Sequence, residues 1–375
     1  MRGRIAAALS AALVAAALGS CTAEPFPPDP DAEVYAALEA FSRSMIDDGA
    51  PAVLIEVRHG GKRWTHAAGV RNLDTREPAT VSDAFRIGSI TKSMVAVSVM
   101  KLVEEGRIDL DQQVSTYLPE FGTVLHPPGP VTVRQLLIHE SGLPDFIAPL
   151  LASGPWQDVM NRPLSLEQQL SLAATVPWKQ KLAQGFEYSS SNYAALGLIV
   201  QRLRSKSIRA VLKADLADPL GLASTGLPRP EDAPPDMIHG YITINARRVD
   251  VTRPEWLSEL APGGAVSTVS EVNAFYAALL QGKLVRDESR TAMLRRDSDL
   301  YGFGLWKWND TCTNRFYRGH QGDIDGYGSV SLTSEDGTRQ LTMAVAYPPA
   351  PPTLDVNPLV FELQDLAEQT LNSLC

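Results

Sequence analysis

The sequence predicts an α+β fold, an α/β sandwich in which a five-stranded antiparallel sheet is flanked by N- and C-terminal helices and a helical lobe is inserted. Three observations predict it: an amphipathic helix near each end of the chain, strand-like runs beside both helices, and a helix-rich middle. With 375 residues the chain is long enough for two lobes. The cleft between such lobes is the expected binding site.

The N-terminal part of the expected sheet lobe consists of one helix and two strands. Residues 31–48 place apolar side chains at helical spacing, and a glycine follows them. Strand-like runs at 52–58 and 63–70 are separated by a histidine, two glycines and a lysine, which indicates a hairpin.

The C-terminal part supplies the other three strands and a closing helix. The strand-like runs are 302–308, 328–333 and 339–347. The last helix begins with Asn357 and Pro358, a capping residue followed by proline at the first helical position. We expect this helix to cover the sheet beside the first helix.

Between the two ends lies the expected helical lobe. Its predicted helices are 90–105, 131–139, 164–175, 192–204, 208–217 and 269–281. We assign residues 86–299 to this lobe, and residues 31–85 together with 300–375 to the sheet lobe.

The first thirty residues predict export. Two arginines precede an apolar run at 5–18 that is short for a bilayer span, which is typical of a signal peptide. Residues 1–20 end in a pattern that resembles a bacterial lipobox, so Cys21 is the expected lipidation site; ordinary cleavage after Ala23 is the alternative. The proline-rich residues 21–30 indicate an extended tether. We therefore expect an extracytoplasmic protein, lipid-anchored to the outer face of the bacterial cell membrane.

The cysteines, the net charge and the absence of several motifs limit the binding partners and cofactors that we expect. Cys312 and Cys375 remain beyond the predicted signal and are expected to form a disulfide in an exported chain, with two separate buried thiols as the alternative. The net charge of -9 argues against nucleic acid as a partner. The sequence contains no HExxH, P-loop, complete GxGxxG or GxSxG, so we expect no metal and no other cofactor.

One Ser-x-x-Lys pair lies at the expected start of a helix, where its serine could act as a nucleophile. Ser89 follows a glycine at the expected start of the helix 90–105, where free N–H groups favour negative charge, and Lys92 lies one turn further on the same face. A serine becomes a good nucleophile when a base takes its proton, and a desolvated lysine can be that base. A second match, Ser98 with Lys101, lies inside the helix and is interpreted as structural.

Three motifs occur far apart along the chain. They are Ser89-Ile90-Thr91-Lys92, Phe186-Glu187-Tyr188-Ser189-Ser190 and Gly319-His320-Gln321-Gly322. In this order they resemble the motifs of the penicillin-recognising serine hydrolases, and more narrowly the group of class C β-lactamases and D-alanyl-D-alanine carboxypeptidases. Residues 136–143 and 263–268 also resemble stretches of that family. The resemblance covers nearly the whole mature chain and implies a β-lactamase/transpeptidase-like fold.

The resemblance also implies an acyl-enzyme mechanism. Ser89 would attack a carbonyl while Lys92 and Tyr188 share the proton transfer, and His320 fills a place where many β-lactamases have a lysine. A histidine loses its charge at about pH 6.5, so we expect the rate to depend on pH there. The backbone N–H groups of Ser89 and Asp323 are expected to form the oxyanion hole. The expected substrate-binding residues are Ser190, Gly322 and Asp323.

Some positions depart from the family's pattern. The second motif usually ends in Asn but here ends in Ser190, and the alternative alignment Ser190-Ser191-Asn192 would copy a Ser-x-Asn form. Some relatives carry an arginine near the position of Trp306 to bind a peptide carboxylate, whereas Asp323 and Asp325 here bring acid to the site. These departures weigh against a carboxypeptidase without affecting the hydrolase assignment.

The favoured function is that of a serine D-alanyl-D-alanine carboxypeptidase acting on cell-wall peptides, because the His-x-Gly motif resembles peptidases more than lactamases. The alternatives are a β-lactamase or esterase on the same scaffold, and a non-catalytic envelope lipoprotein that binds peptides or penicillins. We expect a small peptide or β-lactam-like substrate, a monomer, and contact with the membrane only through the lipid anchor.

Overall fold

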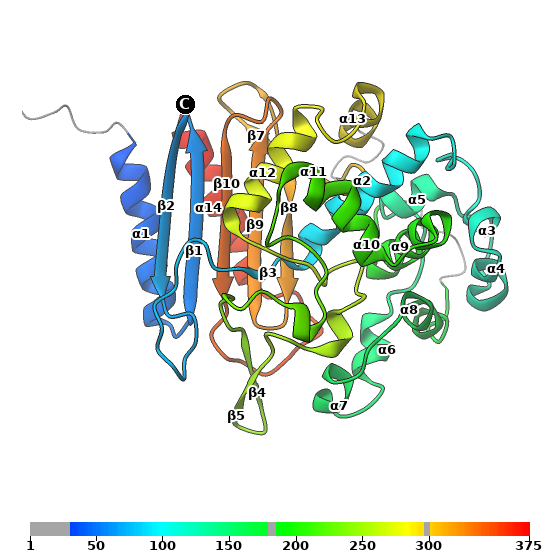
Figure 1. The fold of residues 1–375 in the computed structure, drawn as a ribbon, viewed down its shortest axis with the longest axis horizontal. Helices are drawn as coiled ribbons and strands as arrows, with labels where there is room; N and C mark the ends of the chain where they lie inside the picture. The colour runs from blue at the N-terminus through cyan, green and yellow to red at the C-terminus, as the bar shows by residue number, and fades with distance from the viewer. Residues whose placement is uncertain (1–30, 179–184, 296–300) are drawn as a thin grey trace, which may run out of the picture.

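The computed structural model describes residues 31–178, 185–295 and 301–375. The predicted signal peptide at 1–20, the lipidation site Cys21 and the tether at 21–30 lie outside the described residues. The described residues form a central sheet with helices on both faces (Figure 1).

Six antiparallel strands form the central sheet, in the order β2-β1-β10-β9-β8-β7 (Figure 1). Their bounds are β1 (Ala52–His59), β2 (Lys62–Gly69), β7 (Trp306–Asp310), β8 (Arg315–Ile324), β9 (Tyr327–Ser334) and β10 (Gln340–Ala346). β1 pairs with β10, with Ile55 opposite Met343. The two ends of the chain therefore build one sheet, as predicted.

The predicted number of strands was one too low, because β8 was not recognised. Gly319, Gln321, Gly322 and Asp323 interrupt the apolar alternation on which a strand prediction depends. β8 carries the third motif, so the missed strand is the one that places this motif in the sheet.

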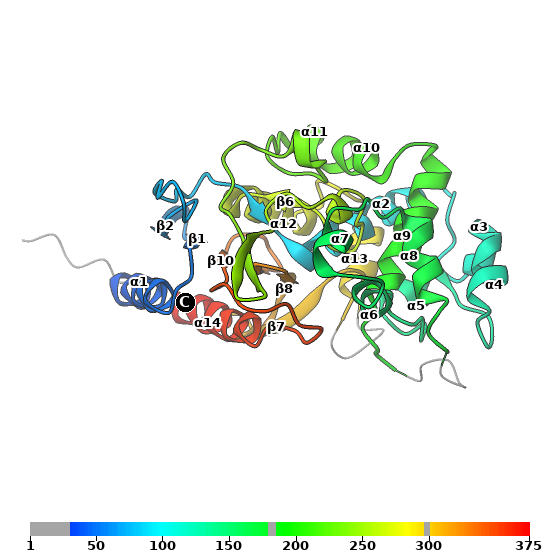
Figure 2. The ribbon, with the colours of Figure 1, turned by 90° about the horizontal axis from the view of Figure 1, so that it is seen from below.

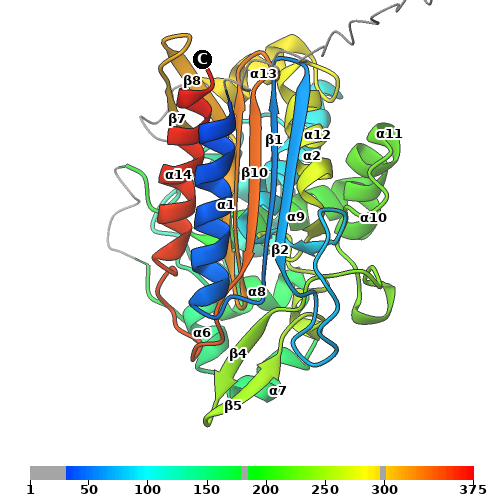
Figure 3. The same cartoon turned by 90° about the vertical axis from the view of Figure 1, so that its left-hand side faces the viewer.

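The helices from the two ends of the chain, α1 (Ala32–Asp47) and α14 (Leu359–Ser373), lie side by side on one face of the sheet (Figure 3). Leu38 of α1 and Leu363 of α14 are fully buried and pack with strand residues such as Val330. The prediction that the last helix covers the sheet beside the first is confirmed.

The middle of the chain covers the other face and extends beyond the β7 edge (Figure 2). Its helices are α2 (Thr91–Glu104), α3 (Val114–Tyr117), α4 (Pro119–Leu125), α5 (Val133–Leu137), α6 (Ile147–Leu151), α7 (Trp156–Met160), α8 (Leu166–Ala173), α9 (Ser190–Arg204), α10 (Ile208–Leu212), α11 (Asp218–Leu220), α12 (Val269–Leu280) and α13 (Asp287–Leu294). Two small ladders join β3 (Phe85–Arg86) to β6 (Val266–Ser267) and β4 (Tyr241–Ile244) to β5 (Arg247–Asp250). In the described ranges, no helix has the length and apolar character that a membrane crossing requires.

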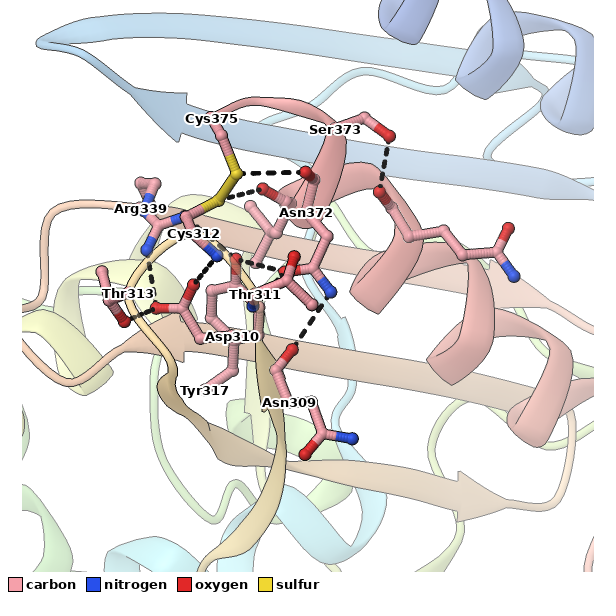
Figure 4. Close-up of a disulfide and its surroundings, with 12 residues drawn as sticks. Asn309, Asp310, Thr311, Cys312, Thr313, Tyr317, Arg339, Asn372, Ser373 and Cys375 are labelled. Atoms are coloured by element: carbon pink, nitrogen blue, oxygen red, sulfur yellow. Dashed lines mark hydrogen bonds and ion pairs between the residues drawn. A yellow bond between two sulfur atoms is a disulfide. The ribbon is translucent and has the colours of Figure 1, made fainter.

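A disulfide joins Cys312 to Cys375, as predicted, and ties the β7–β8 loop to the end of α14 (Figure 4). The two Cα atoms are 5.5 Å apart although the residues are separated by 63 positions in the sequence. Beside the disulfide, the carboxylate of Asp310 accepts hydrogen bonds from the N–H of Cys312, the hydroxyl of Thr313 and the guanidinium of Arg339. The C-terminus is thereby fixed to the edge of the sheet.

Candidate active site

Ser89 stands in a short 3₁₀ turn, η1 (Gly88–Ile90), directly before α2. This turn lies against β8: a Cβ atom at Gly88 would be 2.9 Å from the backbone nitrogen of Asp323, and one at Gly322 would overlap a backbone oxygen. Gly88 also has a φ of +52°, which favours glycine. Two glycines therefore allow Ser89 to lie against the strand of the third motif.

Lys92 is fully buried beside Ser89. Its Nζ atom is 2.9 Å from Oγ of Ser89 and donates a 2.9 Å hydrogen bond to the carbonyl oxygen of Pro262. Burial lowers the pKa of Lys92 to about 7, and the nearby carboxylate of Asp145 acts in the opposite direction. A large share of Lys92 is therefore uncharged at neutral pH, with a lone pair that can take the proton of Ser89.

The phenol of Tyr188 lies against the same pair. Its hydroxyl is hydrogen-bonded with Ser89, and Nζ of Lys92 is 4.8 Å from its ring centroid. Burial raises the pKa of Tyr188, while the hydrogen bond with Ser89 acts in the opposite direction. Since the residue keeps 37% of its surface exposed, water offsets part of this desolvation. Tyr188 stays protonated at neutral pH, so it can donate a proton rather than act as a phenolate.

His320 is buried, and both of its ring nitrogens are hydrogen-bonded within the protein. Nδ1 donates to the carbonyl oxygen of Gln321 at 2.5 Å, and Nε2 accepts from the hydroxyl of Tyr301 at 2.9 Å. Burial and the charge of Lys92 lower the pKa of His320 to about 3. The expectation that His320 loses a charge at about pH 6.5 was therefore wrong, because its ring is already neutral there.

The backbone of Asp323 presents a donor beside η1. Ile324 and Tyr327 are the pair that flanks the two-residue loop between β8 and β9. In such hairpins the flanking pair exchanges hydrogen bonds and successive pairs alternate, so the N–H of Asp323 points away from β9. β7 pairs with β8 only up to Gly319, which leaves this side of Asp323 uncovered by β7. The N–H of Asp323 is thus placed for the oxyanion role that the resemblance implies.

Two hydrogen bonds hold the side chain of Asp323 within the protein. One carboxylate oxygen accepts from the hydroxyl of Tyr347 and the other from the N–H of Asn357, both at 2.9 Å. These bonds hold the carboxylate against the C-terminal segment, whereas the backbone of Asp323 faces η1; the role of Asp323 in substrate binding stays a prediction. Burial and the neighbouring Asp323 raise the pKa of Asp325 to about 7, so the acid at this position is partly neutral at pH 7.

The second motif begins α9, which starts at Ser190, two residues earlier than predicted. The N–H of Ser190 donates a 2.5 Å hydrogen bond to the carboxylate of Asp145, a residue that belongs to none of the three motifs. In the alternative alignment, Asn192 would face a substrate, but its amide is fully buried and bonded to Ser141 and His139. The geometry therefore favours the alignment that uses Tyr188.

Aromatic side chains that sequence reasoning did not assign to the site surround Tyr188. The ring centroid of Trp306 is 6.3 Å from Tyr188, 5.3 Å from Phe186 and 4.9 Å from Tyr301. The alternation of Trp306 with Trp308 on one strand was the available signal. Trp308 is almost fully buried in the core that includes α14 residues. Trp306 is partly buried against the same core, and its ring also lies among the site rings. No sequence pattern pointed to Tyr301.

Comparisons with known proteins agree with this geometry. The family model described as Beta-lactamase matches residues 37–352. Esterase EstB of Burkholderia gladioli is 32% identical over 184 residues, which cover 47% of this chain and 46% of that protein. The putative penicillin-binding protein PbpX of Bacillus subtilis is 26% identical over 256 residues, which cover 68% of this chain and 60% of that protein. The match thus spans about half the length of these curated relatives.

Among solved structures, the D-stereospecific amidohydrolase from a Streptomyces species is similar with a TM-score of 0.72 and 26% identity. The similarity covers 84% of this chain and 94% of the other. The chain therefore shares its overall fold with this amidohydrolase.

Proposed function

The chain belongs to the beta-lactamase family of serine hydrolases, and from this premise we propose that it hydrolyses esters or amides through an acyl-enzyme on Ser89. The observation that carries the proposal is the 2.9 Å contact between Nζ of Lys92 and Oγ of Ser89, together with the burial that lowers the pKa of Lys92 to about 7. A lysine with its ordinary pKa would be charged at neutral pH and could not accept the serine proton.

The proposed reaction has two halves. In the first, Oγ of Ser89 attacks the carbonyl carbon while its proton passes to Lys92, and the N–H groups of Ser89 and Asp323 hold the oxyanion. The leaving alkoxide or amine takes a proton from Tyr188, which Lys92 re-protonates, and the acyl group remains on Ser89. In the second half, water gives a proton to Lys92 as its oxygen attacks the acyl carbon. The acid is released when Oγ of Ser89 leaves and takes a proton back from Tyr188, which Lys92 re-protonates. The net reaction consumes one water and leaves the protein unchanged.

We propose substrates whose leaving group carries no carboxylate beside the scissile bond. The aromatic group around Tyr188 supports this substrate class, since Trp306 stands where some carboxypeptidases place an arginine. Two similar proteins, one named an esterase and the other a D-stereospecific amidohydrolase, support an ester or amide as the bond that is cleaved.

A second candidate function is the D-alanyl-D-alanine carboxypeptidase favoured by the sequence. The observation in its favour is the third motif, whose His320 lies on β8 near Lys92, together with the similarity to a putative penicillin-binding protein. The predicted export would bring such an enzyme to cell-wall peptides.

Intact-mass spectrometry tests both candidates. The protein is incubated with p-nitrophenyl esters, D-phenylalanine amide, a D-alanyl-D-alanine peptide and a penicillin, and acyl adducts and products are measured. We expect an ester or amide adduct that turns over in the wild type and is absent in Ser89→Ala. Ser98→Ala, which alters the other Ser-x-x-Lys pair inside α2, is the matched control and should label as the wild type does. Release of D-alanine alone would favour the second candidate, and failure of a fluorophosphonate to label Ser89 would contradict both.

A further inference from the structure

The segment 136–143, which the proposed reaction does not use, brings a buried histidine beneath Tyr188. His139 follows the end of α5 and has no exposed surface. Its φ is +57°, a left-handed conformation that residues other than glycine seldom adopt. A bulky residue held in this conformation needs surroundings that fix it, so its contacts show what it does.

His139 contacts the ring of Tyr188 and the backbone on both sides of it. The two ring centroids are 4.3 Å apart with an interplanar angle of 28°, so the rings are stacked. Nδ1 of His139 accepts a 3.2 Å hydrogen bond from the N–H of Ser189, and its carbonyl oxygen accepts a 2.7 Å bond from the N–H of Glu187. The residues immediately before and after Tyr188 are therefore both bound to His139.

The hydrogen bonds also define the state of the imidazole. A backbone N–H can only donate, so Nδ1 is unprotonated and Nε2 carries the proton. The side chain of Asn192 lies 3.0 Å from the same Nδ1, and its amide oxygen accepts from the hydroxyl of Ser141 at 2.6 Å, which turns the NH₂ group toward His139. Burial lowers the pKa of His139 well below its usual range. The ring is thus a neutral acceptor, and no proton transfer is required of it.

We propose that His139 is a positioning residue that holds the phenol of Tyr188 against Ser89. Residues 186–189 belong to neither a helix nor a strand, and Tyr188 is 37% exposed, so the local backbone alone does not fix the phenol. A displacement of a reacting group by about 1 Å can lower a rate about a hundredfold. The expected effect on kcat rests on the proposed function. The expected displacement of Tyr188 can be tested whether or not the protein is a hydrolase.

The test compares His139→Ala with His139→Asn. Asparagine tolerates the left-handed conformation and keeps an acceptor for the N–H of Ser189, whereas alanine removes both the acceptor and the stacked ring. With p-nitrophenyl acetate, we expect His139→Ala to lower kcat at least tenfold with KM changed less than threefold. His139→Asn should recover part of kcat. In a Tyr188→Phe background, His139→Ala should cause less than a twofold further loss, because residues that act as a unit are not additive.

Crystal structures of the wild type and both variants supply a readout that needs no substrate. We expect the Tyr188 hydroxyl to leave Ser89 in His139→Ala and to return in His139→Asn. His126→Ala is the matched control: it also removes a histidine at positive φ, but from the exposed end of α4, and should leave kcat unchanged. An unmoved Tyr188, or equal kcat losses with and without the phenol, would overturn the inference. If the wild type has no hydrolase activity but the Tyr188 hydroxyl still leaves Ser89 in His139→Ala, only the proposed function would be contradicted.

Discussion

The hydroxyl of Tyr301 donates a 2.9 Å hydrogen bond to Nε2 of His320. Because Nδ1 of the same ring donates to the carbonyl oxygen of Gln321, both nitrogens are engaged within the protein. Tyr301 is itself buried, and burial raises its pKa, so it remains a donor. The third motif therefore places a neutral, fixed imidazole near Lys92 instead of a second positive charge.

The neutrality of His320 predicts its titration. With its pKa lowered to about 3, the ring resonances that disappear in His320→Gln should not shift between pH 5 and 8 in an NMR titration of the wild type. In the unfolded chain His320 binds a proton at about pH 6.5, whereas in the folded protein it does not. The free energy of unfolding should therefore decrease as pH falls below that value, and His320 contributes up to about 1.4 kcal/mol per pH unit to this decrease. His320→Gln should reduce this slope. An imidazole that titrates near pH 6.5 in the folded protein would contradict the assignment.

The lowered pKa of Lys92 predicts the acid limb of activity. Only the uncharged amine can accept the Ser89 proton, so kcat/KM should rise with pH and reach half its plateau near pH 7. Lys92→Ala should lower kcat by about 100- to 10,000-fold. Since the Asp145 carboxylate raises the pKa of Lys92, Asp145→Asn should move the midpoint to lower pH. The limb should persist in His320→Gln; a midpoint that vanishes in that variant would assign it to the histidine.

The sequence predicted the parts of the site that depend on local pattern. Ser89 and Lys92 share a helix start, and their spacing alone predicts that they meet. Tyr188 was preferred to the alternative alignment because a helix was expected to follow it, and α9 does begin at Ser190. The disulfide followed from there being two cysteines beyond the predicted signal.

Features that depend on burial by distant segments were not predictable in this way. The charge state of His320 is set by its burial and by Tyr301, which belongs to no recognisable motif. β8 was missed because its glycines and polar residues interrupt the apolar alternation that predicts a strand. One of the same glycines allows β8 to lie close to η1. The carboxylate of Asp323 is occupied by Tyr347 and Asn357, which only the packing of the C-terminal segment reveals.

The disulfide is expected to stabilise the fold without affecting the site. In the chain-entropy model, replacing Cys312 and Cys375 with serine should lower the free energy of unfolding by about 4 kcal/mol. Cys312 lies in the loop before β8, at the opposite end of that strand from Asp323, so kcat/KM should remain within about twofold of the wild type. Denaturant unfolding with and without a reducing agent checks this. Equal midpoints for the wild type in the two conditions would show that the disulfide contributes nothing.

Two glycines at positive φ provide a matched test of the contact between η1 and β8. A Cβ at Gly88 would lie 2.9 Å from the nitrogen of Asp323, whereas a Cβ at Gly106, after α2, would meet nothing within 4 Å. Both have positive φ, +52° and +68°, so alanine should cost each about 1 kcal/mol of stability through backbone strain. Only Gly88→Ala should also separate Ser89 from the Asp323 N–H, and the loss of one oxyanion donor should lower kcat about a hundredfold or more. Kinetics and thermal melts of both variants measure the difference. Similar kcat values for the two would mean that the approach of η1 to β8 does not build the oxyanion site.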